Sequence, residues 1–240
     1  MVIYSSPGGV PIRPAQAEPI RDRIERITAD LREIKVFLQI ELSPRRNQRF
    51  RQFLTSEYES LRDLPFALYD QEAKVDYLLV KNYLGRELRN LDLEEDQNEK
   101  LSSLLPFITT LVDLCEARAL ILPMNPKETA QKLFESQVTI VSVTEKVKAK
   151  SEDVCLPKHS AFRAANHIIS LQGHLKEWFS FYSGYDPTFD WWVAQPYKAL
   201  DRSLQGLATT IKEVLVEIKP GDEDAIIGQP IGHRGLLFEL

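Results

Sequence analysis

The histidines are the residues of this chain best suited to metal chemistry, and their spacing decides whether they can perform it. A hydrolytic zinc site on a helix needs two histidines one turn apart and a carboxylate. The closest pair on one predicted helix, His167 and His174, lies two turns or about 10 Å apart, which is too far for one ion. Residues 174–178 begin like the inverted zinc motif H-x-x-E-H, but Trp178 stands where the second histidine is required. The sequence therefore predicts neither a metal site nor a catalytic residue; the four histidines are His159, His167, His174 and His233.

Nucleophilic catalysis has no recognisable motif either. The chain lacks a G-x-S-x-G elbow, a P-loop and a G-x-G-x-x-G sequence. Cys155 precedes His159 by four residues, but Pro157 separates them. The two cysteines, Cys115 and Cys155, are too few for a disulfide framework, so they indicate a reducing compartment and a cytoplasmic protein.

Four arginines cluster near the start of a predicted second helix and are candidates for anion binding. Positive side chains are slightly unfavourable at a helix N-terminus, so an anion would compensate them. We favour the alternatives, in which they form a solvated face or pair with carboxylates of a neighbouring helix. The net charge of −5 gives no general attraction to nucleic acid, and no nucleic-acid partner is predicted. The four are Arg45, Arg46, Arg49 and Arg51, with Phe50 among them.

The densest signal is an aromatic stretch from Trp178 to Trp192, followed by Pro196 and Tyr197. Aromatic side chains bury large areas, so we favour a core plug beneath a turn between two helices. On that interpretation, replacing Trp191 or Trp192 with alanine costs ~3–5 kcal/mol of stability. The alternative is the wall of a ligand cleft, because the run is concentrated on a turn beside two aspartates. The cleft candidates are Tyr185, Asp186, Trp191, Trp192 and Tyr197.

A glycine-containing loop at residues 228–232 precedes a short amphipathic helix expected at 234–240. Backbone amides in such a loop can hold an anion. The expected helix has no C-cap, which favours a truncated chain. The candidates for an anion loop are Gly228, Gly232 and Arg234.

Helices are the elements that must position these residues. Apolar residues recur at helical spacing in every periodic segment, and the β-branched run 138–143 lies inside a well-capped helix. Asn125 followed by Pro126 marks a helix start with little ambiguity. The first three expected helices cover 20–42, 44–65 and about 75–93, and a shorter pair follows, broken at Pro106 and closed by Pro123. Two further helices cover 126–150 and 157–182. The last helix has Pro196 in its first turn and ends at Pro220.

These helices predict an all-α fold, an elongated bundle of about seven to nine mostly antiparallel helices. We expect an irregular Pro/Gly-rich arm at 1–19, a helical domain at 20–218, and a loop with the start of a further helix at 219–240. The composition, 43% hydrophobic and 27% charged, is that of a globular protein. No stretch approaches the ~18 apolar residues of a membrane span, and no signal peptide precedes the fold, so no membrane association is predicted.

With the aromatic stretch and the glycine loop in view, the chain resembles the N-terminal part of the domain-of-unknown-function family number eight-eight-five, which groups zincin-like metallopeptidases. The resemblance is carried by residues 181–192 with 196–197, and by residues 228–232 with 236–237. It implies that an H-E-x-x-H helix follows further towards the C-terminus. The chain itself would then hold no cofactor, and zinc is expected only in the missing C-terminal part.

Two hypotheses about function follow. In the first, implied by the resemblance, the chain is the helical channel wall of a zinc-metallopeptidase-like protein and is not catalytic on its own. Its partners would be the missing C-terminal catalytic part or a split partner chain, with a peptide as substrate. In the second, it is a non-enzymatic helical module whose exposed aromatic and apolar surface binds a protein partner or forms a homo-oligomer.

Overall fold

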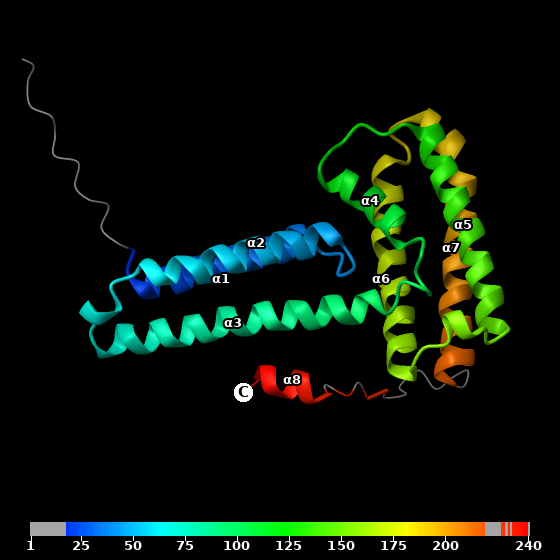
Figure 1. The fold of residues 1–240 in the computed structure, drawn as a ribbon. Coiled ribbons are helices and arrows are strands. Elements are labelled where there is room, and N and C mark those ends of the chain that lie inside the picture. Colours follow the sequence, from blue (N-terminus) through cyan, green and yellow to red (C-terminus); the bar gives the residue numbers. More distant parts are fainter. Residues whose placement is uncertain (1–17, 219–226, 229, 231, 240) are drawn as a thin grey trace, which may run out of the picture.

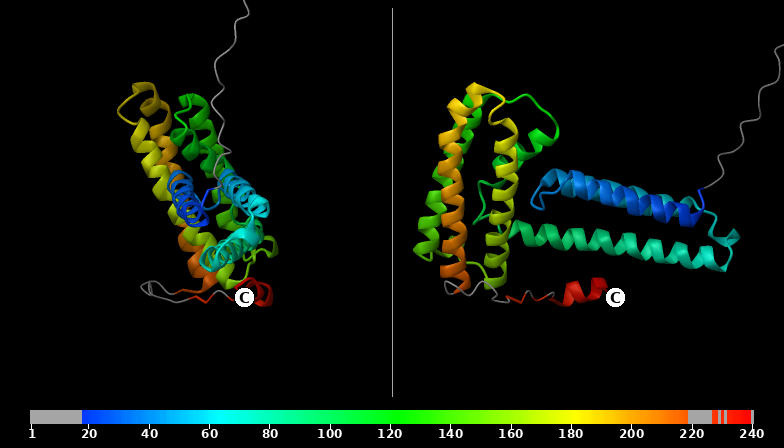
Figure 2. Two further views of the ribbon diagram at one scale, coloured as in Figure 1. Left: turned by 90° about the vertical axis from the view of Figure 1, so that its left-hand side faces the viewer. Right: turned by 180° about the vertical axis from the view of Figure 1, so that it is seen from behind.

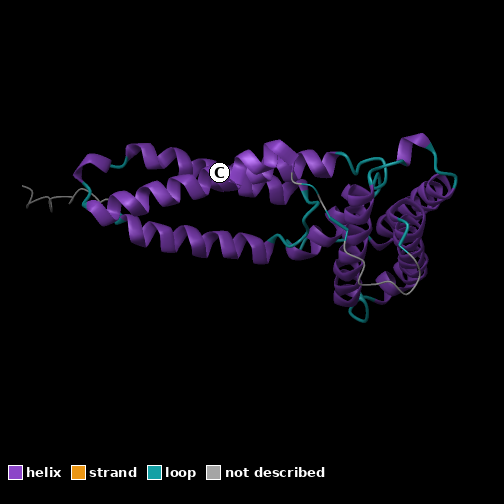
Figure 3. Ribbon diagram, turned by 90° about the horizontal axis from the view of Figure 1, so that it is seen from below, coloured by secondary structure: helices purple, strands orange, loops and turns teal. Residues whose placement is uncertain are grey.

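The computed structural model describes residues 18–218, 227–228, 230 and 232–239. The described residues form eight α-helices and no strand, which confirms the all-α prediction (Figures 1 and 3). The helices are α1 (Ile20–Phe37), α2 (Pro44–Ser60), α3 (Gln71–Glu99), α4 (Ile108–Ala119), α5 (Pro126–Lys148), α6 (Lys158–Tyr182), α7 (Pro187–Ile211) and α8 (Gly232–Glu239). Three short 3₁₀ turns (Leu61–Asp63, Phe66–Leu68 and Glu152–Val154) connect them, and a π-helical turn (Lys212–Val216) extends α7.

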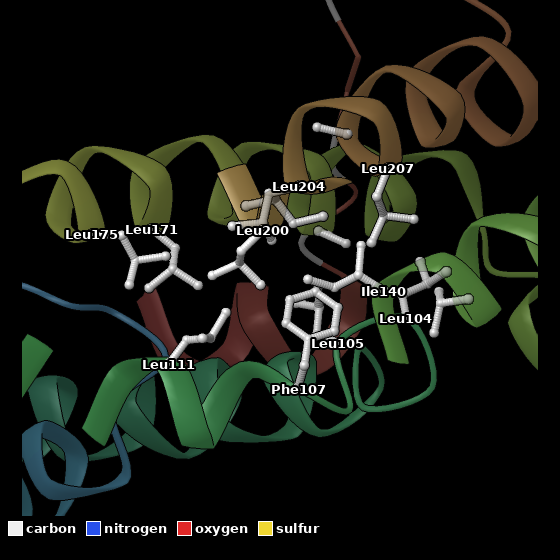
Figure 4. Packing of buried hydrophobic residues seen from close by; sticks show 14 of the residues in the cluster. Leu104, Leu105, Phe107, Leu111, Ile140, Leu171, Leu175, Leu200, Leu204 and Leu207 are labelled. Atoms are coloured by element: carbon white, nitrogen blue, oxygen red, sulfur yellow. The ribbon is translucent and has the colours of Figure 1, made fainter. Parts of the chain in front are cut away.

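The helices pack around two hydrophobic clusters. Helices α1–α3 form a long three-helix unit around the first cluster, which includes Ile27, Leu54 and Leu84. Helices α4–α7 form a four-helix unit around the second and larger cluster, and Figure 2 shows the three-helix unit projecting from its side. Figure 4 shows part of the larger cluster, with Leu111, Ile140, Leu171, Leu175, Leu200, Leu204 and Leu207 converging from α4, α5, α6 and α7.

Helix α6 runs antiparallel to α5 and to α7, so α5 and α7 run side by side in the same direction, and the short α4 crosses α6 obliquely (Figure 1). Lys127 in the first turn of α5 lies 5.7 Å from the ring of Trp192 near the start of α7. At the other end, Lys158 at the start of α6 pairs with Glu217, just after α7. The start of α5 and the α6–α7 turn therefore lie at the same end of this unit.

The first helix ends earlier than expected, at Phe37 instead of residue 42. Residues 38–40 have no regular secondary structure, and Ile40 and Leu42 pack against the cluster of the four-helix unit. Burial of these side chains in the neighbouring unit compensates for the lost helical hydrogen bonds. The segment thus connects the two units before Ser43 caps α2 by accepting a hydrogen bond from the Arg46 amide (3.0 Å).

The third helix starts earlier and runs further than expected, through its acidic segment to Glu99. The acidic side chains are paired across to α2, so they do not end the helix. Arg51 contacts Asp92 at 2.7 Å and Glu95 at 2.6 Å, and Arg46 contacts Glu94 at 3.3 Å. Pairing with a neighbouring helix, one of the two favoured interpretations of the arginine cluster, is confirmed for these two arginines.

The last long helix also begins earlier than expected. Asp186 is the N-cap of α7 and accepts hydrogen bonds from the amide and hydroxyl of Thr188, and Pro187 is its first residue. Pro196 is therefore an interior residue of α7 and does not lie in its first turn. Asn125 caps α5 as predicted, by accepting hydrogen bonds from the Lys127 and Glu128 amides.

Candidate functional site

The core plug beneath the α6–α7 turn exists, and part of the predicted aromatic stretch forms it. Trp178 and Phe189 are almost completely buried, and their rings meet edge to face at 5.6 Å. Tyr182 joins them, with its ring 5.3 Å from that of Phe189. Because α7 begins at Pro187, its buried positions include Phe189 and Val193 as well as the later positions Leu200 and Leu204.

The predicted burial of Trp191 and Trp192 is wrong. Trp191 is 82% exposed and Trp192 is 43% exposed, because they fall between the buried positions of α7. Tyr185, in the turn itself, is 90% exposed. Tyr197 is half-buried and stacks on Phe179, with ring centroids 4.2 Å apart. The sequence predicted a large loss of stability for alanine at 191 or 192. Because Trp191 is exposed, we instead expect Trp191→Ala to change the free energy of unfolding by no more than about 0.5 kcal/mol.

Polar contacts hold this turn in one conformation. The Asp190 carboxylate accepts a hydrogen bond from the Gly184 amide at 3.0 Å, across the turn. Hydrogen bonds from Thr188 hold the pKa of Asp186 below its usual range, so this carboxylate stays charged as a cap. Asp186 is thus occupied as a helix cap and not held free for a ligand.

Two cations lie against aromatic rings at this end of the four-helix unit. Arg118 of α4 lies 5.4 Å from the ring centroid of Phe181 and 3.4 Å from a Glu177 oxygen. Lys127 lies over Trp192. Cation–ring contacts of this kind contribute about 0.5–1 kcal/mol at exposed sites.

The α4–α5 loop leads to the same end of the unit (Figure 1), and it carries two exposed apolar side chains, Ile121 (82% exposed) and Leu122. Sequence reasoning missed them, although the run 120–123, three apolar residues before a proline, was a usable signal. We call this surface the aromatic end; it comprises Ile121, Leu122, Phe181, Tyr185, Trp191 and Trp192.

Ile121 occupies a backbone conformation that β-branched residues rarely adopt, with φ of 53°. It follows the last turn of α4, where the Leu122 amide donates to the Ala117 carbonyl and the Ile121 amide to the Arg118 carbonyl. These two hydrogen bonds are those of a Schellman motif, in which glycine is the usual residue. An exposed isoleucine there costs stability without a compensating burial.

Replacing Ile121 with glycine is expected to raise the free energy of unfolding by about 1 kcal/mol, because glycine adopts positive φ without a Cβ clash. Lys150, with φ of 51° in the equivalent position after α5, is the matched control, and Lys150→Gly should give a similar gain. Urea denaturation followed by circular dichroism measures both. A loss of stability in Ile121→Gly alone would show that the isoleucine side chain stabilises the fold.

The described residues also enclose a pocket of about 310 Å³ where the two units meet. It is lined by the end of α1 and residues 38–40, by Arg45 of α2, by the C-terminal half of α4, and by His174 and Glu177 of α6. Cys115 contributes a buried thiol, and burial raises its pKa to about 12, so it is a neutral group and not a nucleophile. The volume is at the lower end of the range of about 300–1,000 Å³ for ligand pockets.

The structure does not bring the glycine loop to the aromatic end. Helix α8 starts at Gly232, which has φ of 72°, and lies beside α3, whereas the α6–α7 turn lies at the far end of the four-helix unit (Figure 1). Gly228 is exposed. Outside the described part of the chain lie the side chain of Arg234, residues 1–17 of the predicted arm, and residues 219–226.

The histidines do not converge. Among the described residues, no three His, Cys, Asp or Glu side chains are placed to hold one metal ion. His167 is buried between the units, where Arg163 donates a hydrogen bond from Nε to its Nε2 at 3.2 Å. Burial, and then the charge of Arg163, lower the pKa of His167 to about 4, although Glu41 opposes this. An imidazole that accepts a hydrogen bond at Nε2 is neutral, so the 3.6 Å approach of Glu41 to Nδ1 is not an ion pair.

His167 should make the fold sensitive to mild acid. Its folded pKa of about 4 lies below the ordinary 6.5, so its contribution is complete above pH 6.5 and is lost as pH falls towards 4. Replacing His167 with glutamine should reduce the loss of stability in this window, and the exposed His233→Gln serves as control. Equal pH profiles for His167→Gln and the parent chain in urea titrations would contradict this assignment.

Comparison of the chain with protein-family models, with curated proteins and with solved structures finds no significant match. Within the part of the chain that the structure describes, no helix is long and apolar enough to cross a membrane. The aromatic end and the pocket are therefore the features of the structure that bear on function.

Proposed function

We propose that this chain is a helical protein-binding module whose aromatic end docks an apolar segment of a partner. The observation that carries the proposal is the exposure of Tyr185 in the α6–α7 turn and of Trp191 near the start of α7, which are 90% and 82% exposed. Exposed aromatic side chains gathered on one surface mark interaction sites, and tyrosine and tryptophan dominate binding energy at interfaces.

The rigidity of the turn supports this proposal. The Asp186 cap and the Asp190–Gly184 hydrogen bond hold the aromatic side chains on an ordered backbone. A surface that is already ordered loses less entropy on binding, which favours affinity. The strained Ile121 is consistent with a side chain kept for contact with a partner at some cost in stability.

The family resemblance suggests which partner this is. We propose the C-terminal zinc-binding part of a metallopeptidase-like protein, on the same or a separate chain, with a peptide as substrate of the assembly. Under this proposal zinc belongs to that part, and the present helices wall one side of its channel. A cytoplasmic setting is part of the proposal, because Cys115 and Cys155 are free thiols.

A photoreactive amino acid at position 191 tests the docking surface, with position 134 as a matched control. Phe134 is 58% exposed on α5 of the same unit but lies outside the aromatic end. The proposal expects one protein to be crosslinked from 191 and not from 134 in the native host. The purified partner should then bind the parent chain at least tenfold more tightly than Trp191→Ser, a loss of about 1.4 kcal/mol or more.

Elemental analysis of that partner tests the resemblance separately. Stoichiometric zinc and an H-E-x-x-H sequence in the partner would support the peptidase-like assembly. A partner without either would leave the docking surface in place and refute the peptidase hypothesis. Equal affinity for Trp191→Ser, Phe134→Ser and the parent chain would refute the docking surface itself.

A further inference from the structure

The pocket between the two units has apolar walls from two separate stretches of chain. Val36 and Phe37 end α1 and Leu38 follows them, whereas Leu120 caps the C-terminus of α4. Val36 and Phe37 are 58% and 54% exposed, so the pocket opens to solvent beside them. Neither side chain belongs to the hydrophobic cluster of the three-helix unit, so both line the pocket without contributing to that core.

The charged groups of the pocket differ in whether they already have a partner. Glu116 accepts a hydrogen bond from the Ser43 hydroxyl, and Glu177 accepts one from Arg118 at 3.4 Å. Arg45 forms no ion pair or hydrogen bond with any residue that the structure describes, and the same is true of the His174 imidazole. Both carboxylates are therefore engaged, while a guanidinium and an imidazole remain available.

An uncommitted guanidinium above apolar walls matches a ligand with one anionic group and an apolar body. Arginine binds carboxylates through two parallel hydrogen bonds, and such charge-assisted bonds are the stronger ones in proteins. The neighbouring Cys115 is a neutral thiol and does not repel an anion. A pocket of about 310 Å³ favours a small ligand.

We infer that this pocket binds a small carboxylate with an apolar body, its carboxylate on Arg45 and its body against Phe37 and Leu120. A free short-chain fatty acid and the C-terminal carboxylate of a peptide that ends in an apolar residue share this chemistry. The inference does not depend on the aromatic end, which lies on other residues.

Isothermal titration calorimetry of the full chain with octanoate, octanol and N-acetylleucine tests the inference. Octanoate should bind saturably at neutral pH, and octanol should bind at least about tenfold more weakly because it lacks the charge. N-acetylleucine mimics a peptide C-terminus, so tighter binding of this probe than of octanoate would identify a peptide as the source. Tighter binding of octanoate would identify a free acid.

Two variants connect binding to the pocket. Arg45→Gln should weaken octanoate binding about tenfold or more and leave octanol unchanged. Arg49→Gln is the matched control, because Arg49 lies one turn further along α2, has no partner among the described residues and does not line the pocket. Ala119→Phe should abolish binding, because Ala119 lines the pocket and is exposed, so that the larger side chain fills it without entering the core.

The outcomes that overturn the inference are specific. Absence of saturable binding by both octanoate and N-acetylleucine would refute it. So would equal weakening in Arg45→Gln and Arg49→Gln, or octanoate binding that survives in Ala119→Phe. Thermal melts of all three variants, which replace exposed side chains, should match the parent chain and show that any lost binding is not lost folding.

Discussion

Replacing Trp178 with alanine is expected to lower the free energy of unfolding by about 3–5 kcal/mol. Trp178 has no exposed surface, and its ring packs against Phe189 at 5.6 Å and Tyr182 at 6.0 Å. The truncation leaves a cavity at the point where α6 and α7 meet. Trp191→Ala is the matched control, with an expected effect within about 0.5 kcal/mol because that side chain is exposed.

Urea denaturation followed by far-ultraviolet circular dichroism gives both values. A third variant, Trp178→Phe, should cost much less than Trp178→Ala, because it keeps most of the ring. It also removes an indole N–H that no described residue accepts and whose burial is itself unfavourable. If Trp191→Ala were as damaging as Trp178→Ala, the assignment of core and surface on this turn would be wrong.

Replacing Glu57 with alanine is expected to cost about 3 kcal/mol, because it leaves a buried guanidinium without its counter-charge. Arg23 is 7% exposed and contacts Glu57 at 2.7 Å, and Arg26 contacts the other carboxylate oxygen at 2.8 Å. The three residues join α1 to α2 in the three-helix unit. Glu59→Ala is the control, because Glu59 lies on the same helix and is exposed.

The same carboxylate gives a pH dependence. Burial acts to raise the pKa of Glu57, but the hydrogen bonds from Arg26 and Arg23 outweigh it, so the folded pKa lies below the ordinary value. A depressed acid pKa adds stability above the unfolded value of about 4.3 and loses it as pH falls further. The parent chain should lose this contribution below about pH 4, and Glu57→Ala should not. Parallel pH profiles for the two chains would contradict this role of the ion pairs.

The sequence alone determined the elements whose signals are local. The Asn125 and Ser43 caps each accept a hydrogen bond from an amide two or three residues away, so their effect is independent of the rest of the fold. The apolar stripes of α5, α6 and α7 likewise predict the buried face of each helix, because side chains at helical spacing share a face in any packing arrangement. These signals were sufficient to predict an all-α bundle.

The tertiary structure alone decided which side chains of the aromatic stretch are buried. That choice depends on where α7 begins. The sequence predicted a helix with Pro196 in its first turn, whereas the helix begins at Pro187, with Phe189 in the core and Trp191 exposed. The pocket was equally inaccessible from sequence, because Phe37, Arg45 and Leu120 meet only where two separately packed units contact each other. At residues 38–42, burial of apolar side chains against the four-helix unit outweighs the preference of this segment for a helix. The spacing of residues along the sequence does not indicate where such long-range contacts form.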